Sequence, residues 1–171
     1  AGGIGIRFAA DEVRRMGRTA TGVRGIRLRD GDRVVSLDVC DGAKTLLVAT
    51  ENGYGKRTEF GEYRQTPRGG MGVTAIKRAD RNGLIVAAHA VAEDESIISI
   101  TSDAQMVRSP VREIGVYGRS AQGVRLVRLS EGAKLVSVSV CESEGEGAAD
   151  AGSSVGNDVN AHTDINEGEN G

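Results

Sequence analysis

Residues 57–73 read RTEFGEYRQTPRGGMGV and contain the pattern Arg-x4-Glu-x5-Arg-x3-Gly-Val, which occurs three times in the chain. The copies begin at Arg7, Arg57 and Arg108, with shifts of 50 and 51 residues. A fixed period of this size is typical of proteins built from stacked units, each too small to bury its own hydrophobic face. The sequence therefore predicts a string of three similar modules.

Each module reads as a series of short β-strands. Residues 46–50 and 54–58 flank Asn52-Gly53, a dipeptide that favours a type I′ turn between antiparallel strands. Short helical turns are expected near residues 11–15 and 61–64, but no segment has the periodicity of a crossover helix. The other strands are expected where apolar residues run or alternate, at 23–28, 34–39, 73–77, 84–91, 97–101, 106–109, 124–129 and 135–140.

About four strands per module predict an all-β, propeller-like assembly of four-stranded blades rather than an α/β fold. The blades are expected near residues 5–50, 54–101 and 105–140, within a body of residues 1–140, with strand exchange between neighbours. A closed propeller has about 4–8 blades, so three blades predict a partial ring. Because the chain begins inside a repeat, we expect it to be a fragment.

Composition narrows the class of protein. Trp is absent and aromatic residues make up 3% of the chain, so the core must consist of Val, Ile, Leu and Ala. Cys40, Val91 and Cys141 share one repeat position, which predicts buried apolar cysteines rather than metal ligands. No apolar run approaches the ~18 residues of a membrane span and no signal peptide is present. These features predict a cytoplasmic protein.

Charge divides the chain into two parts. Residues 1–140 hold all 22 Lys and Arg against 16 Asp and Glu, a net charge of +6. Residues 141–171 hold eight acidic residues and no basic ones, a net charge of −8. Such a segment buries too little apolar surface to offset its ordering entropy, so we expect a disordered acidic tail. It either competes with phosphates for the basic body or serves only as a solubilising extension.

Arginine dominates the basic residues, at 18 of 22, and its planar guanidinium matches phosphate oxygens. The first arginine of each repeat either contacts phosphate or forms an ion pair with the glutamate of its own repeat. The second arginine (Arg18, Arg68, Arg119) lies in a loop beside small residues, so it is the stronger candidate for ligand contact.

At these loops the chain resembles the C-terminal domain of the A subunit of bacterial-type DNA gyrase. The matching stretches are RRMGRTATGVRGI (14–26), TENGYGKRT (50–58) and GRSAQGVR (118–125), within a resemblance that covers residues 3–140. The family's box Gln-Arg-Arg-Gly-Gly-Lys-Gly is absent. Its nearest equivalent is QTPRGGMG (65–72), where Thr66 and Pro67 intervene and Met71 replaces the lysine.

The resemblance implies a β-pinwheel that binds and wraps double-stranded DNA on its basic rim without reading sequence, in support of ATP-dependent negative supercoiling. It implies that the partners in an A2B2 enzyme are the B subunit together with the remainder of the A subunit. It also implies a nucleoid-associated location, and ATP and Mg on other domains or subunits, with no cofactor and no catalytic or metal site here. The candidate DNA-binding residues are Arg15, Arg18, Arg24, Lys56, Arg57, Arg68, Lys77, Arg119 and Arg125.

Two alternative functions stay open at this stage. One is the C-terminal domain of the sister enzyme, topoisomerase IV, and the other is a protein-binding propeller scaffold. An enzyme in its own right is disfavoured, because the sequence shows no nucleophile–base pair, metal cluster or phosphate-cradling loop. Tyr54, Tyr63 and Tyr117 are accordingly expected to pack within blades or lie on the rim.

Overall fold

A computed structural model describes residues 1–142, which form short β-strands and three single-turn 3-10 helices. All but the first two residues of the predicted acidic tail lie outside this range. In chain order the elements are β1 (Ile4–Gly5), η1 (Ala10–Glu12), β2 (Thr45–Thr50), β3 (Tyr54–Glu59), η2 (Phe60–Glu62), β4 (Val73–Thr74), β5 (Ile85–Val91), β6 (Glu95–Thr101), β7 (Met106–Pro110), η3 (Val111–Glu113), β8 (Val124–Arg125) and β9 (Leu135–Glu142).

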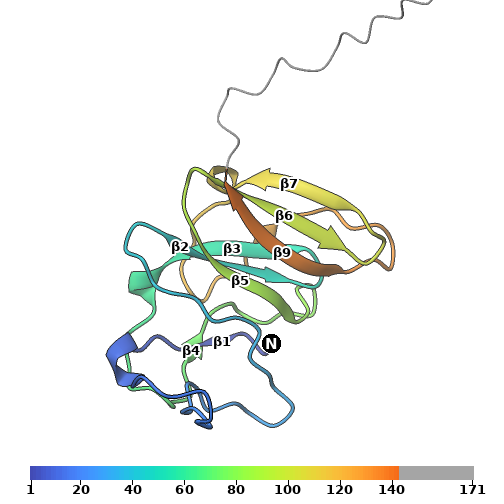
Figure 1. The fold of residues 1–171 in the computed structure, drawn as a ribbon. Helices are drawn as coiled ribbons and strands as arrows, with labels where there is room; N and C mark the ends of the chain where they lie inside the picture. Colours follow the sequence, from blue (N-terminus) through green and yellow to red (C-terminus); the bar gives the residue numbers. More distant parts are fainter. Residues whose placement is uncertain (143–171) are drawn as a thin grey trace, which may run out of the picture.

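The strands form three antiparallel sheets that lie one above another in Figure 1. The first contains β1 and β4, the second has the order β5-β2-β3-β8, and the third has the order β7-β6-β9. The strand β8 belongs to the following repeat, so neighbouring repeats share a sheet. The all-β, blade-like prediction is confirmed, and within residues 1–142 the sheets do not close into a ring.

The predicted hairpin between β2 and β3 is confirmed, but its turn type is wrong. A type I′ turn needs positive φ at both central residues, whereas only Gly53 has it here, at 77°. The Gly53 N–H donates to the Thr50 carbonyl at 2.9 Å. The Asn52 side chain instead donates to the carbonyl oxygens of Asp80 and Arg81, so a tertiary contact holds this residue.

The predicted strands 23–28 and 34–39 of the first module do not form. In the later modules the corresponding segments pair with strands that the repeat register places nearby, β5 with β2 and β8 with β3. Among residues 1–142, no strand pairs with residues 23–28 or 34–39. A strand without a partner leaves its backbone groups unpaired, so these residues follow irregular paths.

The core lies between the sheets rather than inside any one of them. Leu47 and Ala49 of β2 pack into a cluster that reaches Ile97 and Val138 of the third sheet. Val48, on the opposite face of the same strand, packs into a second cluster toward the first module. Successive strand residues point to opposite faces, so β2 is buried on both sides and joins the neighbouring layers.

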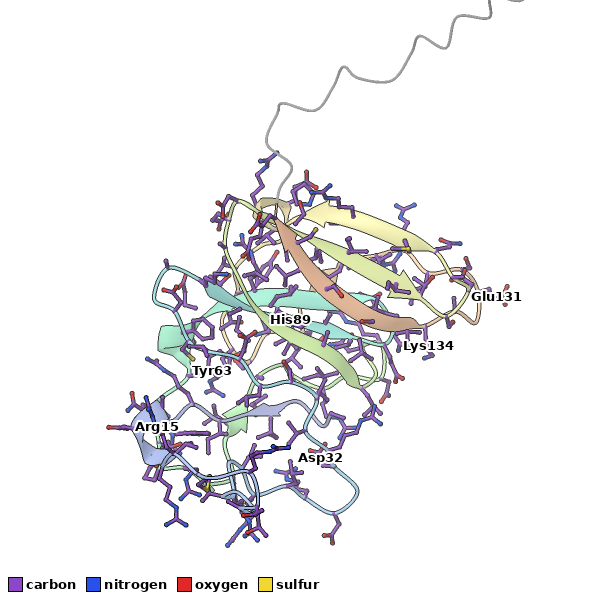
Figure 2. All side chains as sticks on the ribbon, viewed as in Figure 1. Arg15, Asp32, Tyr63, His89, Glu131 and Lys134 are labelled. Atoms are coloured by element: carbon purple, nitrogen blue, oxygen red, sulfur yellow. The ribbon has the colours of Figure 1, made fainter. Side chains whose placement is uncertain are left out.

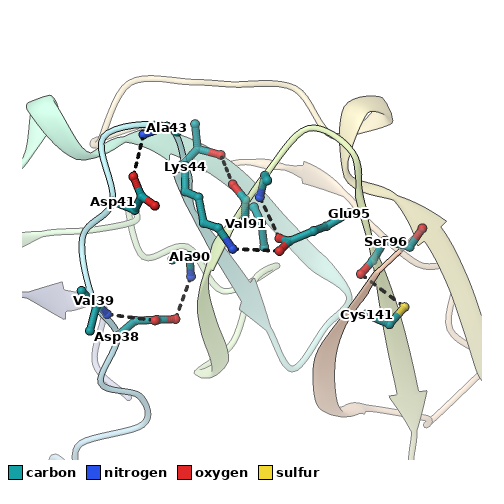
Figure 3. A network of polar contacts seen from close by, with 12 residues as sticks. Asp38, Val39, Asp41, Ala43, Lys44, Ala90, Val91, Glu95, Ser96 and Cys141 are labelled. Carbon is teal, nitrogen blue, oxygen red and sulfur yellow. Dashed lines mark hydrogen bonds and ion pairs between the residues drawn. The ribbon is translucent and has the colours of Figure 1, made fainter. Parts of the chain in front are cut away.

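Side-chain contacts, rather than a strand ladder, hold the irregular first module beside β5 (Figure 3). The Asp38 Oδ2 atom accepts a hydrogen bond from the Ala90 N–H at 2.7 Å. Lys44 Nζ lies 2.8 Å from Glu95 Oε1 at the beginning of β6. These contacts leave Cys40 exposed, so the expected burial of that thiol is wrong.

We predict that the chain self-associates through the irregular segment and that Leu37→Ser reduces this. Leu37 is 87% exposed and Val39 is 81% exposed, and apolar side chains grouped on a surface favour association. Sedimentation velocity over a range of protein concentrations measures the effect. Equal association of Leu37→Ser and wild type would contradict it, and Glu131→Ser, which changes an exposed residue of another loop, is the control.

Candidate nucleic-acid interface

The first arginine of the repeat ties each module to the next one. Arg7 Nη1 lies 3.4 Å from the Tyr63 carbonyl oxygen. Arg57 occupies the same position one module later, and its Nε donates to the carbonyl oxygen of Ile114 at 2.6 Å. Because Tyr63 and Ile114 are also equivalent in the repeat, the same link occurs at both junctions. These arginines therefore stabilise the stacking of modules.

Of the two roles open to the first arginine, an ion pair with the glutamate of its own repeat does not form in the first two repeats. Glu12 accepts a hydrogen bond from the Arg68 N–H at 2.7 Å, and Arg57 pairs with Glu93 rather than Glu62, at 2.6 Å. Arg57 is only 3% exposed, so its guanidinium is turned inward. Of the candidate DNA-binding residues, it is one that the structure places away from solvent.

Lys56 is the second inward-facing candidate, with no exposed surface. Its Nζ donates to the carbonyl oxygens of Gly118 at 2.6 Å and Arg119 at 2.8 Å, and it lies 3.0 Å from Thr58 Oγ1. Burial, together with the nearby Arg119 charge, lowers the pKa of Lys56 to about 8. Lys56 therefore holds the loop that carries Arg119 instead of reaching toward a ligand.

The second arginine reaches back to the preceding module. Arg68 Nη1 donates to the Arg24 carbonyl oxygen at 2.7 Å, and Arg119 Nη1 donates to the equivalent Thr74 carbonyl oxygen at 2.8 Å. Both side chains are partly buried. Since a guanidinium has five N–H donors, each arginine keeps donors for a ligand while its position is determined by the module before it.

Arg15, Arg18 and Arg24 lie on the irregular part of the first module and are exposed. Figure 2 shows Arg15 beside η1, at the end of the molecule opposite the loop that holds Lys134. The structure therefore does not bring all the candidates together. It spreads them over successive modules.

Sequence reasoning missed a basic position that recurs in all three modules. Arg27, Lys77 and Arg128 each lie four residues after the valine of the Gly-Val pair, and only Lys77 was a candidate. All three are exposed. The Arg27 N–H donates to the Gly70 carbonyl at 2.8 Å, and the Lys77 N–H donates to the equivalent Ala121 carbonyl at 3.2 Å. Extending the repeat alignment past Gly-Val would have identified them.

A second missed residue lies beside a candidate. Arg125 on β8 and Arg81 in the loop before β5 both approach the ring of Tyr54, with guanidinium carbons 5.6 Å and 5.0 Å from its centroid. Tyr54 is partly exposed and both arginines are exposed. By contrast, Tyr63 is 3% exposed and therefore buried. No sequence spacing predicts that Arg81 approaches Tyr54.

Metal sites and membrane-spanning helices are not found in the described residues. Among residues 1–142 no group of three or more His, Cys, Asp or Glu side chains could hold a metal ion. The same part of the chain includes no helix with the length and hydropathy needed to span a membrane. The basic loops are thus the feature that a functional interpretation must explain.

Comparison with known proteins agrees with this description. The family described as "DNA gyrase C-terminal domain, beta-propeller" matches the chain three times, at residues 1–41, 44–92 and 95–142. The DNA gyrase A subunit of Aminobacterium colombiense is 45% identical over 142 residues, which cover 83% of this chain and 17% of that protein. Its Escherichia coli counterpart is 48% identical over 131 residues, covering 77% and 15%. The chain thus spans less than a fifth of these relatives.

Solved structures show the same likeness. A DNA gyrase A C-terminal domain superposes with a TM-score of 0.75 at 32% identity, over 81% of this chain and 47% of that one. A topoisomerase IV C-terminal domain superposes with a TM-score of 0.77 at 24% identity, over 82% and 44%. The second comparison establishes the fold alone.

Proposed function

The chain belongs to the DNA gyrase C-terminal domain family, and from this premise we propose that it binds double-stranded DNA on its exposed basic loops and wraps it without reading base sequence. Its identity with gyrase A subunits, 45–48%, favours gyrase over topoisomerase IV. The whole enzyme's activity, ATP-dependent negative supercoiling, belongs to the same proposal.

The observation that carries the proposal is the recurrence of an exposed cation at one position of every module. Arg27, Lys77 and Arg128 form no ion pair with any carboxylate of residues 1–142. Their loops are joined to those of the neighbouring module by backbone hydrogen bonds. Cations at a regular spacing suit the regular charge of a duplex, and contacts to phosphate carry no sequence information.

Wrapping requires that phosphate contacts offset the cost of bending. Bending a duplex of 20–30 base pairs by tens of degrees costs on the order of 1–6 kcal/mol. Arginine contacts with phosphate are charge-assisted and release counterions. Successive modules supply several such contacts, so a bent duplex is favoured at low salt and released as the salt concentration rises.

The wider assembly is also part of the proposal. Its partners would be the remainder of the gyrase A subunit together with the B subunit, in an A2B2 enzyme. ATP and Mg²⁺ would act on those other parts of the enzyme. A cytoplasmic, nucleoid-associated location follows from the proposed ligand.

We predict that the combined substitutions Arg27→Gln, Lys77→Gln and Arg128→Gln weaken duplex binding by at least about tenfold at low salt. If each side chain contacts one phosphate, the slope of log K against log salt concentration falls by about 2.7, or 0.9 per contact. Fluorescence anisotropy with duplexes of unrelated sequence gives both quantities. Wild-type affinities for those duplexes should be similar.

The control removes the same charge from exposed arginines elsewhere, by Arg33→Gln, Arg64→Gln and Arg112→Gln. These substitutions should change the slope much less. If the two triple variants behave alike, only net charge matters and the loop interface is wrong. A wild-type chain that binds no duplex but captures acidic peptides would support the protein-binding scaffold instead.

A further inference from the structure

Tyr54, Arg81 and Arg125 form a cluster on the surface at the junction of the second and third modules. Tyr54 begins β3 and lies directly opposite Arg125 of β8 in the antiparallel register. Arg125 Nη2 donates to the Tyr54 hydroxyl oxygen at 3.1 Å. Arg81 comes from a third element, the loop between β4 and β5, and its Nη2 donates to the Gly123 carbonyl at 3.3 Å.

The cluster gathers two positive charges that are not neutralised by an ion pair. Neither arginine forms an ion pair with a carboxylate of residues 1–142. The hydrogen bond from Arg125 lowers the pKa of the Tyr54 hydroxyl, and the charges of both arginines lower it further. The two guanidinium charges repel each other in the free protein, and an anion bound to both of them reduces that repulsion.

The contacts leave most of each guanidinium free. One Nη2 donor of each arginine is engaged with the protein, and a guanidinium has five N–H donors. The aromatic ring restricts both long side chains by cation–π contact, so less side-chain entropy is lost when a ligand binds. The cluster is therefore preorganised for an anion that accepts several hydrogen bonds, as a phosphate group does.

The cluster occurs at one junction only among the described modules. Tyr54 is replaced by Ile4 in the first module and by Gln105 in the third. The loop arginine is equally specific, because the equivalent turn contains Gly31 in the first module and Gly132 in the third. The cluster of Tyr54, Arg81 and Arg125 thus differs from the single basic residue that recurs at one position of every module.

We propose that Arg81 and Arg125, positioned by Tyr54, form a phosphate-binding site that anchors one point of the duplex at the junction of the second and third modules. This rests on the proposed function. Here Tyr54 is a positioning residue, and the two arginines contact the phosphodiester. The wrapped duplex is consequently held more firmly at this junction than at the one before it.

The test measures duplex binding by the whole 171-residue chain over a range of salt concentrations. Arg81→Gln and Arg125→Gln should each weaken binding by about tenfold at low salt and lower the salt slope by about 0.9. Tyr54→Leu changes no charge, yet it should weaken binding by about threefold, a loss of about 0.6 kcal/mol at RT ln 3. Tyr54→Phe keeps the ring and should recover most of that loss.

The controls separate this site from general charge and from misfolding. Arg112→Gln removes one exposed charge elsewhere and should have a smaller effect than either cluster arginine. Circular dichroism and thermal unfolding of each variant should match the wild type. A Tyr54→Leu chain that is folded and binds as the wild type does, or cluster variants that equal Arg112→Gln, would overturn the proposal.

A calorimetric titration with inorganic phosphate at constant ionic strength distinguishes a site for the phosphates of a duplex from a site for free phosphate. Weak, unsaturated binding supports a site for the duplex backbone. Saturable binding that Arg81→Gln abolishes would indicate a site for free phosphate and overturn the assignment to DNA. If the wild-type chain binds no duplex, the proposed function itself fails, whereas equal binding by wild type and variants contradicts this inference alone.

Discussion

Replacing Gly123 by alanine is expected to lower the free energy of unfolding by about 4 kcal/mol, because it combines backbone strain with a backbone clash. Gly123 has a φ of 81°, a conformation that residues with a Cβ atom rarely adopt. A Cβ atom at this position would lie 2.5 Å from the Gly55 carbonyl oxygen and 2.8 Å from its carbon. The strand exchange between β3 and β8 depends on this close approach.

Urea unfolding of the whole chain measures the loss, and Gly118→Ala is the matched control. Gly118 lies in the same loop and has nothing within 4 Å of an added Cβ, so its substitution should change stability by less than about 0.5 kcal/mol. Gly123→Ala should also weaken DNA binding, since β8 carries Arg125. Unchanged stability of Gly123→Ala would show that the exchanged strand is not needed to hold the modules together.

Replacing Lys56 by alanine is expected to cost about 3 kcal/mol of stability at neutral pH. The substitution leaves the carbonyl oxygens of Gly118 and Arg119 without their donor and opens a cavity where a fully buried side chain lay. Chemical denaturation measures the difference. Lys77→Ala is the control, because that lysine is exposed; equal stability of the two variants would contradict a structural role for Lys56.

The same pair of proteins tests the pH dependence. The pKa of Lys56 is about 8 in the folded protein against an ordinary value of 10.5, so between these values the unfolded chain binds more protons than the folded one. Stability then rises with pH. The contribution of Lys56 should therefore increase from pH 8 toward 10.5, and the gap between wild type and Lys56→Ala should widen. A constant gap would show that Lys56 titrates normally.

Local pattern predicted the repeated elements well. The strands at 46–50, 54–58 and 84–91 form as β2, β3 and β5, and the expected turns near 11–15 and 61–64 appear as η1 and η2. These elements depend on the alternation of apolar residues and on glycines at turns. Both signals lie within a few residues of the element itself, so they can be recognised in the sequence. The family and its blade architecture were accordingly recognisable in the amino-acid sequence alone.

The local sequence pattern did not predict which segments pair or come into contact across modules. The segments 23–28 and 34–39 have the composition of strands but lack a partner, and Leu37 and Val39 remain exposed. Arg81 joins Tyr54 only because the loop before β5 turns back over β3. Such contacts depend on how the modules stack. Neither the residue types nor their spacing within one segment predicts that stacking.

The sequence by itself determined the period, the strand-forming runs and the concentration of arginine in residues 1–140. It could not separate the basic side chains that face solvent from those that hold modules together. Lys56 and Arg57 stand beside each other in one of the matching stretches, yet both are buried and donate to carbonyl oxygens of the next module. The tertiary structure decided this, because the stacking of modules brings a backbone carbonyl oxygen within reach of the cation. That carbonyl lies far away in the sequence, so the residues around the cation do not reveal it.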